Sequence, residues 1–137
     1  MTGPSTAVGV RWIEDMSPKD LLALDSCTKC GRCHEVCPAR ASGAPLSPRD
    51  LILDLREYAD RTHGVNRLGA MLLGHTPFGT VTGDPSSGAG RPLPGDLISA
   101  DTLWSCTTCG ACMEVCPVAI EHVPMIIQMR RALVDDG

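Results

Sequence analysis

The sequence predicts an all-α fold. A twelve-residue stretch with four cysteines occurs twice, as CTKCGRCHEVCP at residues 27–38 and CTTCGACMEVCP at residues 106–117. The longest patterned segment between them, SPRDLILDLREYADRTHG, has the periodicity of one helical stripe and not the alternation of a strand. Ser-Pro pairs, which are common where helices begin, open that segment and the segment before the first copy. Helices should therefore lead into and out of the cysteine stretches.

The first element is predicted close to the N-terminus. Residues 1–16 are expected to form an N-terminal arm, and residues 17–137 are expected to form the domain itself. The arm lacks the basic and apolar regions of a secretory signal. Ser17 and Pro18 begin the first predicted helix, which leads directly into the first cysteine stretch.

A helical insert is predicted after the first cysteine stretch, over residues 39–74. Ser47 is suited to cap a helix whose first residue is Pro48, and Gly64 is suited to end it. Residues 65–73 are expected to add a short helix. The insert therefore consists of helices joined by short connections.

The second half of the domain begins with a loop. Residues 75–95 are rich in Gly, Pro and Ser, which predicts a long mobile loop. A helix should follow within the segment GDLISADTLW, residues 95–104, and lead into the second cysteine stretch. The apolar residues after the last cysteine predict a terminal helix opened by Pro124.

Composition argues against several classes of function. The 137 residues carry a formal net charge of −4, whereas a nucleic-acid-binding surface needs clustered positive charge. No apolar run approaches the ~20 residues that a membrane-spanning helix needs. We therefore expect a soluble, cytoplasmic protein that reaches the inner face of the cell membrane only through partners.

The cysteine spacing predicts the chemistry. All eight cysteines lie in the two copies, each spaced C-x2-C-x2-C-x3-C-P. Three thiolates on one tight loop can each bind a different iron of a cubane cluster. Zinc sites usually present separated C-x2-C pairs, disulfides are rare in a chain without an export signal, and the ligand patterns of plant-type and Rieske [2Fe–2S] centres are absent. The sequence predicts two [4Fe–4S] clusters.

The fourth cysteine of each copy is expected to serve the opposite cluster. A three-residue spacer carries its thiol past its own cluster, and two-cluster ferredoxins are ligated in this crossed manner. The same spacing predicts cluster centres roughly 10–13 Å apart. The first cluster would be held by Cys27, Cys30, Cys33 and Cys116. The second cluster would be held by Cys106, Cys109, Cys112 and Cys37.

The residues around the ligands differ between the two copies. Gly31 and Gly110 occupy matching positions, where the loop should need a positive φ. Four basic residues accompany only the first copy: Lys29, Arg32, His34 and Arg40. Because positive charge stabilises a reduced cluster, the first cluster should have the higher potential, unless these groups merely face water or a partner. The other histidines are expected at the surface or at helix ends and not as ligands: His63, His75 and His122.

The segments that flank the motifs carry a further resemblance. CTKCGRCHEVCPA followed by PLSPRDLILDLRE, and LWSCTTCGACMEVCPVAIEHV followed by MRRALV, resemble the iron–sulfur domain of heterodisulfide-reductase-related proteins. That group includes the small iron–sulfur subunit of heterodisulfide reductase and the membrane-bound electron-transfer-flavoprotein:quinone reductases. The resemblance covers about residues 17–134 and implies an α-helical ferredoxin domain with two [4Fe–4S] clusters. Larger relatives also carry a transmembrane module and catalytic domains with paired cysteines, which we do not expect in these 137 residues.

These features predict an electron-transfer subunit of a larger redox complex, with no catalytic residue of its own. It would relay electrons between a dehydrogenase, flavoprotein or hydrogenase and a quinone-linked acceptor, with a membrane quinone-reducing subunit as one candidate partner. Two alternatives stay open at this point. The chain could be a freely diffusing ferredoxin-type carrier, or a quinone-reducing subunit in which Trp104 or His122 lines a quinone pocket.

Overall fold

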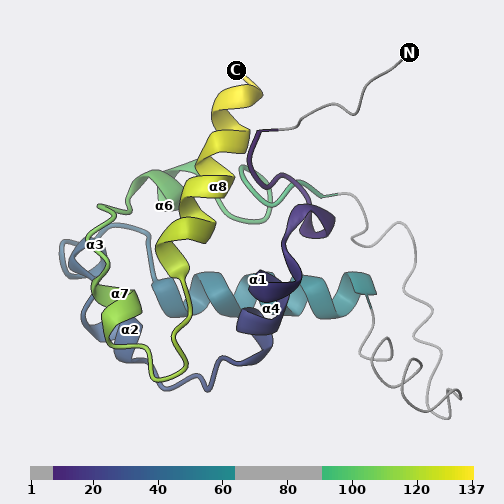
Figure 1. The fold of residues 1–137 in the computed structure, drawn as a ribbon. Coiled ribbons are helices and arrows are strands. Elements are labelled where there is room, and N and C mark those ends of the chain that lie inside the picture. Colours follow the sequence, from purple (N-terminus) through teal and green to yellow (C-terminus); the bar gives the residue numbers. More distant parts are fainter. Residues whose placement is uncertain (1–7, 64–90) are drawn as a thin grey trace, which may run out of the picture.

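The computed structural model describes residues 8–63 and 91–137, and within these ranges the fold is helical with no β-strand (Figure 1). The predicted all-α class is therefore confirmed for the described part of the chain. The elements are η1 (Ile13–Asp15), α1 (Pro18–Asp25), α2 (Arg32–Glu35), α3 (Pro38–Ala41), α4 (Pro48–His63), α6 (Ala100–Trp104), α7 (Ala111–Glu114) and α8 (His122–Asp135).

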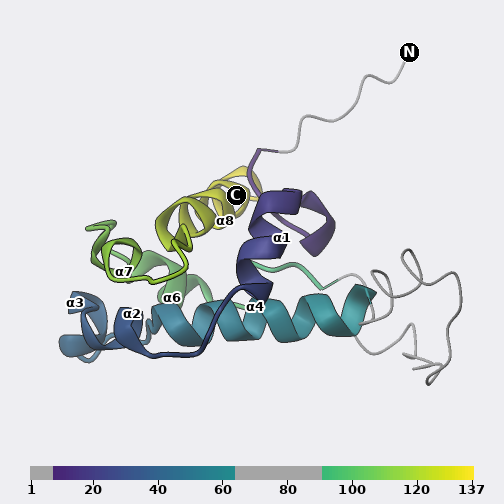
Figure 2. The ribbon, with the colours of Figure 1, turned by 60° about the horizontal axis from the view of Figure 1, so that its bottom comes forward.

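The helices form two similar halves. In the first half α1 packs against α4, and in the second half α6 packs against α8. The short helices α2 and α7, one from each cysteine motif, pack against each other at one end of the molecule (Figures 1 and 2). The motifs are therefore adjacent in space although they are far apart in the sequence.

Serine caps begin the helices where the sequence predicts them. The Ser17 hydroxyl accepts a hydrogen bond from the backbone N–H of Asp20 at 3.1 Å, and Ser99 accepts one from Thr102 at 3.1 Å. Ser47 caps α4 in the same way. Each cap satisfies one of the free N–H groups of the first turn, which stabilises the helix by about 1 kcal/mol.

The start of the last helix differs from the prediction. We expected Pro124 to open it, but α8 begins at His122, so that Pro124 is its third residue. The first four N–H groups of a helix have no partner within the helix. A proline in the third position therefore costs no hydrogen bond, and the helix can begin before it.

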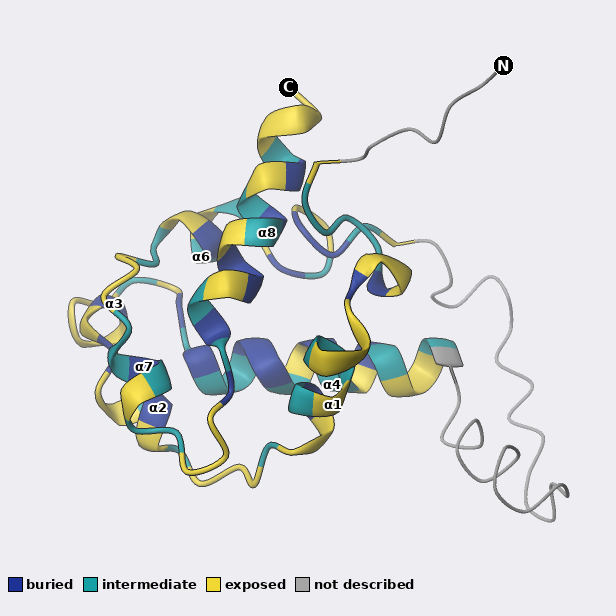
Figure 3. Ribbon diagram, viewed as in Figure 1, coloured by how far each residue is buried: buried dark blue, intermediate teal, exposed yellow. Residues whose placement is uncertain are grey.

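The core is aliphatic and lies where the two halves meet (Figure 3). Ile52 and Leu55 are the fully buried residues of the α4 stripe that the sequence predicted. Each such side chain contributes roughly 1.5–3 kcal/mol when it is fully buried. Other large side chains that are fully or almost fully buried are Ile13, Leu24, Leu93, Leu103, Ile120, Ile126 and Met129.

Two segments that the sequence placed outside the core belong to it. Residues 8–16, which we assigned to an N-terminal arm, contribute the buried side chains of Ile13 and Met16. Residues 91–95, which we assigned to a mobile loop, include the fully buried Leu93, whose N–H donates to the carbonyl of Arg11 at 2.7 Å. An apolar residue inside a Gly/Pro-rich stretch can be a core residue, and composition alone does not reveal it. The rest of that loop and the helix predicted at residues 65–73 lie outside the described residues.

The segment that follows the undescribed residues is also tied to α4. The hydroxyl of Tyr58 accepts a hydrogen bond from the N–H of Arg91 at 3.1 Å and lies 3.1 Å from the carbonyl of the same residue. Arg91 in turn forms an ion pair with Asp96 at 2.7 Å. These contacts fix the chain before it enters α6.

Gly9 tests how closely the N-terminal segment must approach α8. Its φ is +89°, and a Cβ atom there would lie 2.6 Å from the backbone N of Ala132. The Gly9→Ala variant should therefore lose about 2–3 kcal/mol of unfolding free energy. Chemical denaturation of the anaerobic protein, followed by circular dichroism, measures this loss.

Gly43 provides the matched control. It has a similar φ of +84°, but nothing lies within 4 Å of a Cβ atom built there. The Gly43→Ala variant should lose only about 1 kcal/mol, the cost of a left-handed backbone with a side chain. Equal losses in the two variants would contradict the close approach of Gly9 to α8.

Candidate iron–sulfur site

The repeated letters produce a repeated backbone. Gly31 and Gly110 each have φ 79° and ψ −5° and stand directly before α2 and α7, so the predicted positive φ is confirmed. Lys29 and Thr108 also occupy matching positions, with φ values of 58° and 56°. A left-handed residue with a side chain costs about 1–2 kcal/mol. Its occurrence in both copies indicates that the ligand loop requires this turn.

Two cavities lie at the cysteine motifs, and each is lined by four thiols. Their empty volumes are nearly equal, about 310 Å³ and 320 Å³. The thiols of the first cavity are those of Cys27, Cys30, Cys33 and Cys116. The thiols of the second cavity are those of Cys106, Cys109, Cys112 and Cys37. Each cavity therefore receives three thiols from one motif and the fourth from the other.

The donor set fits a polynuclear cluster. Among the residues that the structure describes, no group of three Cys, His, Asp or Glu side chains converges closely enough to hold a single metal ion. The thiols instead surround a space, as they must when each binds a different iron of a cubane. Thiolate is also the ligand that iron–sulfur clusters use. The residues present therefore fit two [4Fe–4S] clusters.

The exposed thiol of each cavity, Cys30 in the first and Cys109 in the second, has a lowered pKa, which favours its thiolate form. The backbone N–H of Arg32 lowers the pKa of Cys30, and the hydroxyl of Thr28 lowers it further. The backbone N–H of Ala111 lowers the pKa of Cys109 in the same manner, with help from Thr107. Both threonine hydroxyls of the repeat therefore favour the thiolate form of a ligand sulfur.

The inner thiol of each cavity is buried. Burial raises the pKa of Cys112 to about 11, and it also raises the pKa of Cys33. These two thiols are therefore protonated at neutral pH when no iron is bound. Metal binding must displace their protons, so that the filling of the cavities and the packing around them are coupled.

The two cavities are neighbours. The pKa of Cys112 in the second cavity is raised mainly by burial and then by Cys106 and Cys109 of the same loop. The thiol of Cys33 in the first cavity makes a smaller contribution in the same direction. The packing of α2 against α7 holds the two inner cysteines in this relation. Further N–H groups face the sulfurs from the loops: Thr108 donates to Cys106 and Ile120 donates to Cys116, both at 3.4 Å.

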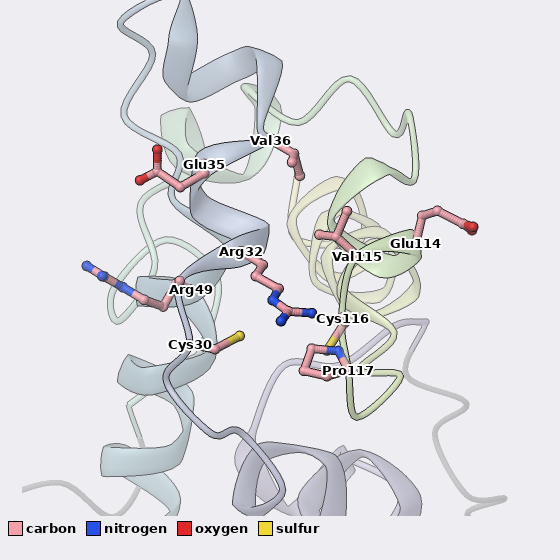
Figure 4. A pocket seen from close by; sticks show the side chains of 10 residues that line it. Cys30, Arg32, Glu35, Val36, Arg49, Glu114, Val115, Cys116 and Pro117 are labelled. Atoms are coloured by element: carbon pink, nitrogen blue, oxygen red, sulfur yellow. The ribbon is translucent and has the colours of Figure 1, made fainter.

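An open depression lies beside the first cavity (Figure 4). Its walls come from both motifs, with Cys30 on one side and Cys116 on the other. The guanidinium group of Arg32 extends into the space between these two cysteines. This charge helps to lower the pKa of Cys30.

The other basic residues of the first motif are divided between the cavity and its surroundings. Lys29 lines the first cavity. His34 is hydrogen-bonded through Nδ1 to the Ser47 hydroxyl at 2.7 Å. Arg40 lies 3.8 Å from Glu35, as expected for an exposed ion pair. Of the four basic residues, Arg32 and Lys29 are thus the ones that lie at the cysteines.

His122 lies at a helix end, which was one of the two positions expected for it, because it is the first residue of α8. It does not lie at the surface, since it is only 1% exposed. Its ring lines the first cavity, and its Nδ1 is hydrogen-bonded to the carbonyl of Ile120 at 3.0 Å. Burial lowers the pKa of His122. No local signal in the sequence identifies this burial, because it results from the packing of α8 against the cysteine loop.

Trp104 and His122 are at different places. Trp104 is 53% exposed on α6 and stacks on Arg130 of α8, with 4.9 Å between the guanidinium carbon and the ring centroid. Arg130 is about two helical turns from His122. His63 is the last residue of α4, and His75 lies outside the described residues. The two residues that we considered for a quinone pocket are therefore not brought together.

The helical scaffold and its two four-thiol cavities define an iron–sulfur protein with sites for two [4Fe–4S] clusters. Residues 26–120 match the family described as the 4Fe-4S dicluster domain. The chain belongs to this family. The family match confirms the two predicted [4Fe–4S] clusters, and together with the relatives described next it confirms the predicted family resemblance.

Curated relatives extend the comparison. The chain is 42% identical over 126 residues to the "Probable membrane-anchored ferredoxin" of Chromohalobacter salexigens, a match that covers 92% of this chain and 19% of that protein. It is 40% identical over 131 residues to the "EtfAB:quinone oxidoreductase" of Syntrophomonas wolfei, with 92% and 18% covered. It is 34% identical over 127 residues to one component of the dihydromethanophenazine:CoB--CoM heterodisulfide reductase of Methanosarcina acetivorans, with 90% and 27% covered.

The chain thus spans about a fifth of the length of the first two relatives. The comparison with solved structures finds no match. In the described ranges, no helix is both long enough and apolar enough to cross a membrane.

Metal analysis tests the cofactor content. The anaerobically purified protein should contain close to eight irons and eight acid-labile sulfides, because eight thiols divide into four for each cubane. Stoichiometric zinc should be absent. Two zinc ions and no sulfide would contradict the assignment of both cavities.

Proposed function

We propose that the protein relays electrons through its two clusters inside a larger redox complex. The observation that carries this proposal is the adjacency of the two cavities: α2 packs against α7, and Cys33 of the first cavity lies close enough to Cys112 of the second to help raise its pKa. Each [4Fe–4S] cluster, when bound, can accept and pass on one electron. Two neighbouring clusters suit the passage of electrons through the protein better than the storage of electrons at one site.

The proposed partners follow from the relatives. One of them is named as a quinone oxidoreductase of an electron-transfer flavoprotein, and another as part of a heterodisulfide reductase. We infer that electrons enter from a flavoprotein, dehydrogenase or hydrogenase and leave toward a quinone-linked acceptor. The chain would act on the cytoplasmic side and meet the membrane only through such an acceptor.

We also propose crossed ligation of the two clusters. The lining of the cavities supports it, because Cys116 lies with the first motif and Cys37 lies with the second. The Pro after each fourth cysteine supports it as well. In the first motif that proline, Pro38, begins α3, which turns the chain away from the cluster of its own loop.

A cysteine substitution tests the crossed ligands. The Cys116→Ser variant should alter the first cluster, by loss of one iron or a shift in potential, and should spare the second. Potentiometric titration followed by EPR spectroscopy measures both clusters. Cys112→Ser is the matched control, since Cys112 belongs to the same motif but should affect only the second cluster. If Cys116→Ser and Cys112→Ser alter the same cluster, the ligation is not crossed.

The charges at the motifs support an order of potentials. Arg32 lies between two cysteines of the first cavity and Lys29 lines it, whereas the matching positions of the second motif hold Ala111 and Thr108. A positive charge near a cluster favours its reduced form. The first cluster is therefore proposed to have the higher potential, so that a single electron shared by the two clusters would reside mainly on the first.

Purification of the native assembly tests the relay. Affinity purification of the tagged chain from its own cells, under anaerobic conditions, should recover a stable complex that contains a flavoprotein or another dehydrogenase. The donor substrate of that complex should reduce both clusters. Recovery of the chain alone, reduced and reoxidised by several unrelated enzymes, would instead support a freely diffusing carrier.

A further inference from the structure

The two halves of the molecule present an arginine to the same atom of each motif. Arg130 on α8 contacts the carbonyl oxygen of Cys106, and Arg56 on α4 lies 3.5 Å from the carbonyl oxygen of Cys27. These cysteines are the first ligands of their motifs. The arrangement follows from the repeat of the fold, in which α1 packs on α4 as α6 packs on α8.

Arg130 makes the stronger contact. Its guanidinium group donates to the carbonyl of Leu103 from Nε at 2.9 Å and from Nη2 at 2.6 Å. The same Nη2 donates to the carbonyl of Cys106 at 2.5 Å. Arg130 thereby binds one carbonyl of α6 and the carbonyl of the first ligand residue, and it fixes the position from which the ligand loop begins.

The two arginines differ in what neutralises them. Arg56 lies 3.6 Å from a carboxylate oxygen of Asp25 and 4.0 Å from one of Asp60. Trp104 occupies in the second half the position that Asp25 occupies in the first. Trp104 follows Asp25 by 79 positions, which is also the separation between the first cysteines of the two motifs. Arg130 stacks on that tryptophan ring, which carries no charge. In the part of the chain that the structure describes, no carboxylate forms an ion pair with Arg130.

We propose that Arg130 is a positioning residue for the second cluster. It holds the carbonyl of Cys106 and keeps a positive charge, not offset by a carboxylate, beside this ligand. The charge favours the reduced cluster, since reduction adds one negative charge. Arg130 thus narrows the difference in potential that Arg32 and Lys29 create in favour of the first cluster.

This proposal rests on the proposed function, because it requires a second cluster bound through Cys106. A purely structural role is the competing explanation. In that case Arg130 would only secure the end of α6, and its loss would change stability without changing the potential. The experiment must therefore separate charge from packing.

The reduction potential of the second cluster reports the effect of the Arg130 charge. In the Arg130→Gln variant the ratio of oxidised to reduced second cluster, at a fixed ambient potential, should rise about tenfold. This corresponds to a decrease of roughly 59 mV for a one-electron couple. Arg130→Lys retains the charge and should recover most of the shift. Potentiometric EPR titration gives the values, and the second cluster is recognised by its alteration in Cys106→Ser.

Arg56→Gln is the matched control. Because Asp25 and Asp60 already offset the charge of Arg56, its loss should change the ratio for the first cluster less than twofold. A first-cluster shift as large as that of Arg130→Gln would show that carboxylate partners do not matter, and it would overturn the distinction between the two arginines.

Trp104→Asp provides a test that leaves Arg130 in place. It reproduces in the second half the acidic partner of the first half, and it should shift the second cluster in the same direction as Arg130→Gln. Trp104→Phe, which retains an uncharged ring, should leave the potential unchanged. Because Trp104 is 53% exposed, these variants should fold even if Arg130→Gln does not.

Two failures can be told apart. Iron and sulfide are measured in each preparation before titration, and fewer than two clusters in the unaltered protein would contradict the proposed function. If both clusters are intact, but Arg130→Gln and Trp104→Asp leave the second potential where it is, the role proposed for Arg130 is wrong and the relay proposal stands.

Discussion

The sharing of thiols between the two motifs is the constraint on which the rest of the structure depends. Cys116 lines the first cavity and Cys37 lines the second, so neither cavity is complete until segments 79 positions apart come together. The contact between α2 and α7 accomplishes this, and α4 and α8 support it from outside. Clusters ligated in the proposed crossed manner would also join the two halves, which would allow the modest aliphatic core to suffice.

Electrostatics distinguishes two sites that the backbone makes nearly identical. The loops have the same φ values at Gly31 and Gly110, and the cavities have nearly the same volume. The differences lie in the side chains around the cavities: Arg32 lies beside the first cavity, and Arg130 contacts the carbonyl of Cys106 at the second. A duplicated frame with individually placed charges allows two chemically equal clusters to take different roles.

The sequence predicted those features that short-range chemistry determines. The spacing of the cysteines indicated the division of thiols that the two cavities display, and Ser17 and Ser47 marked helix starts because a cap acts within one turn. Apart from this division of the thiols, features that depend on distant contacts were not predicted. Leu93 is buried and is hydrogen-bonded to the N-terminal segment, and His122 is buried at the first cavity. The sequence near these two residues contains no pattern that indicates these contacts. The role of Arg130 likewise depends on carbonyls more than 20 positions away.

The N-terminal segment of the domain lies against its last helix. The N–H of Val10 donates to the carbonyl of Gln128 at 3.1 Å, and Arg11 pairs with Asp135 and Asp136 near the end of α8. The chain therefore enters and leaves the domain at neighbouring points. A unit of this shape can be inserted into a longer polypeptide as a cassette, because it does not force the flanking segments apart. Such a geometry would suit a domain whose sequence matches only about a fifth of much longer relatives.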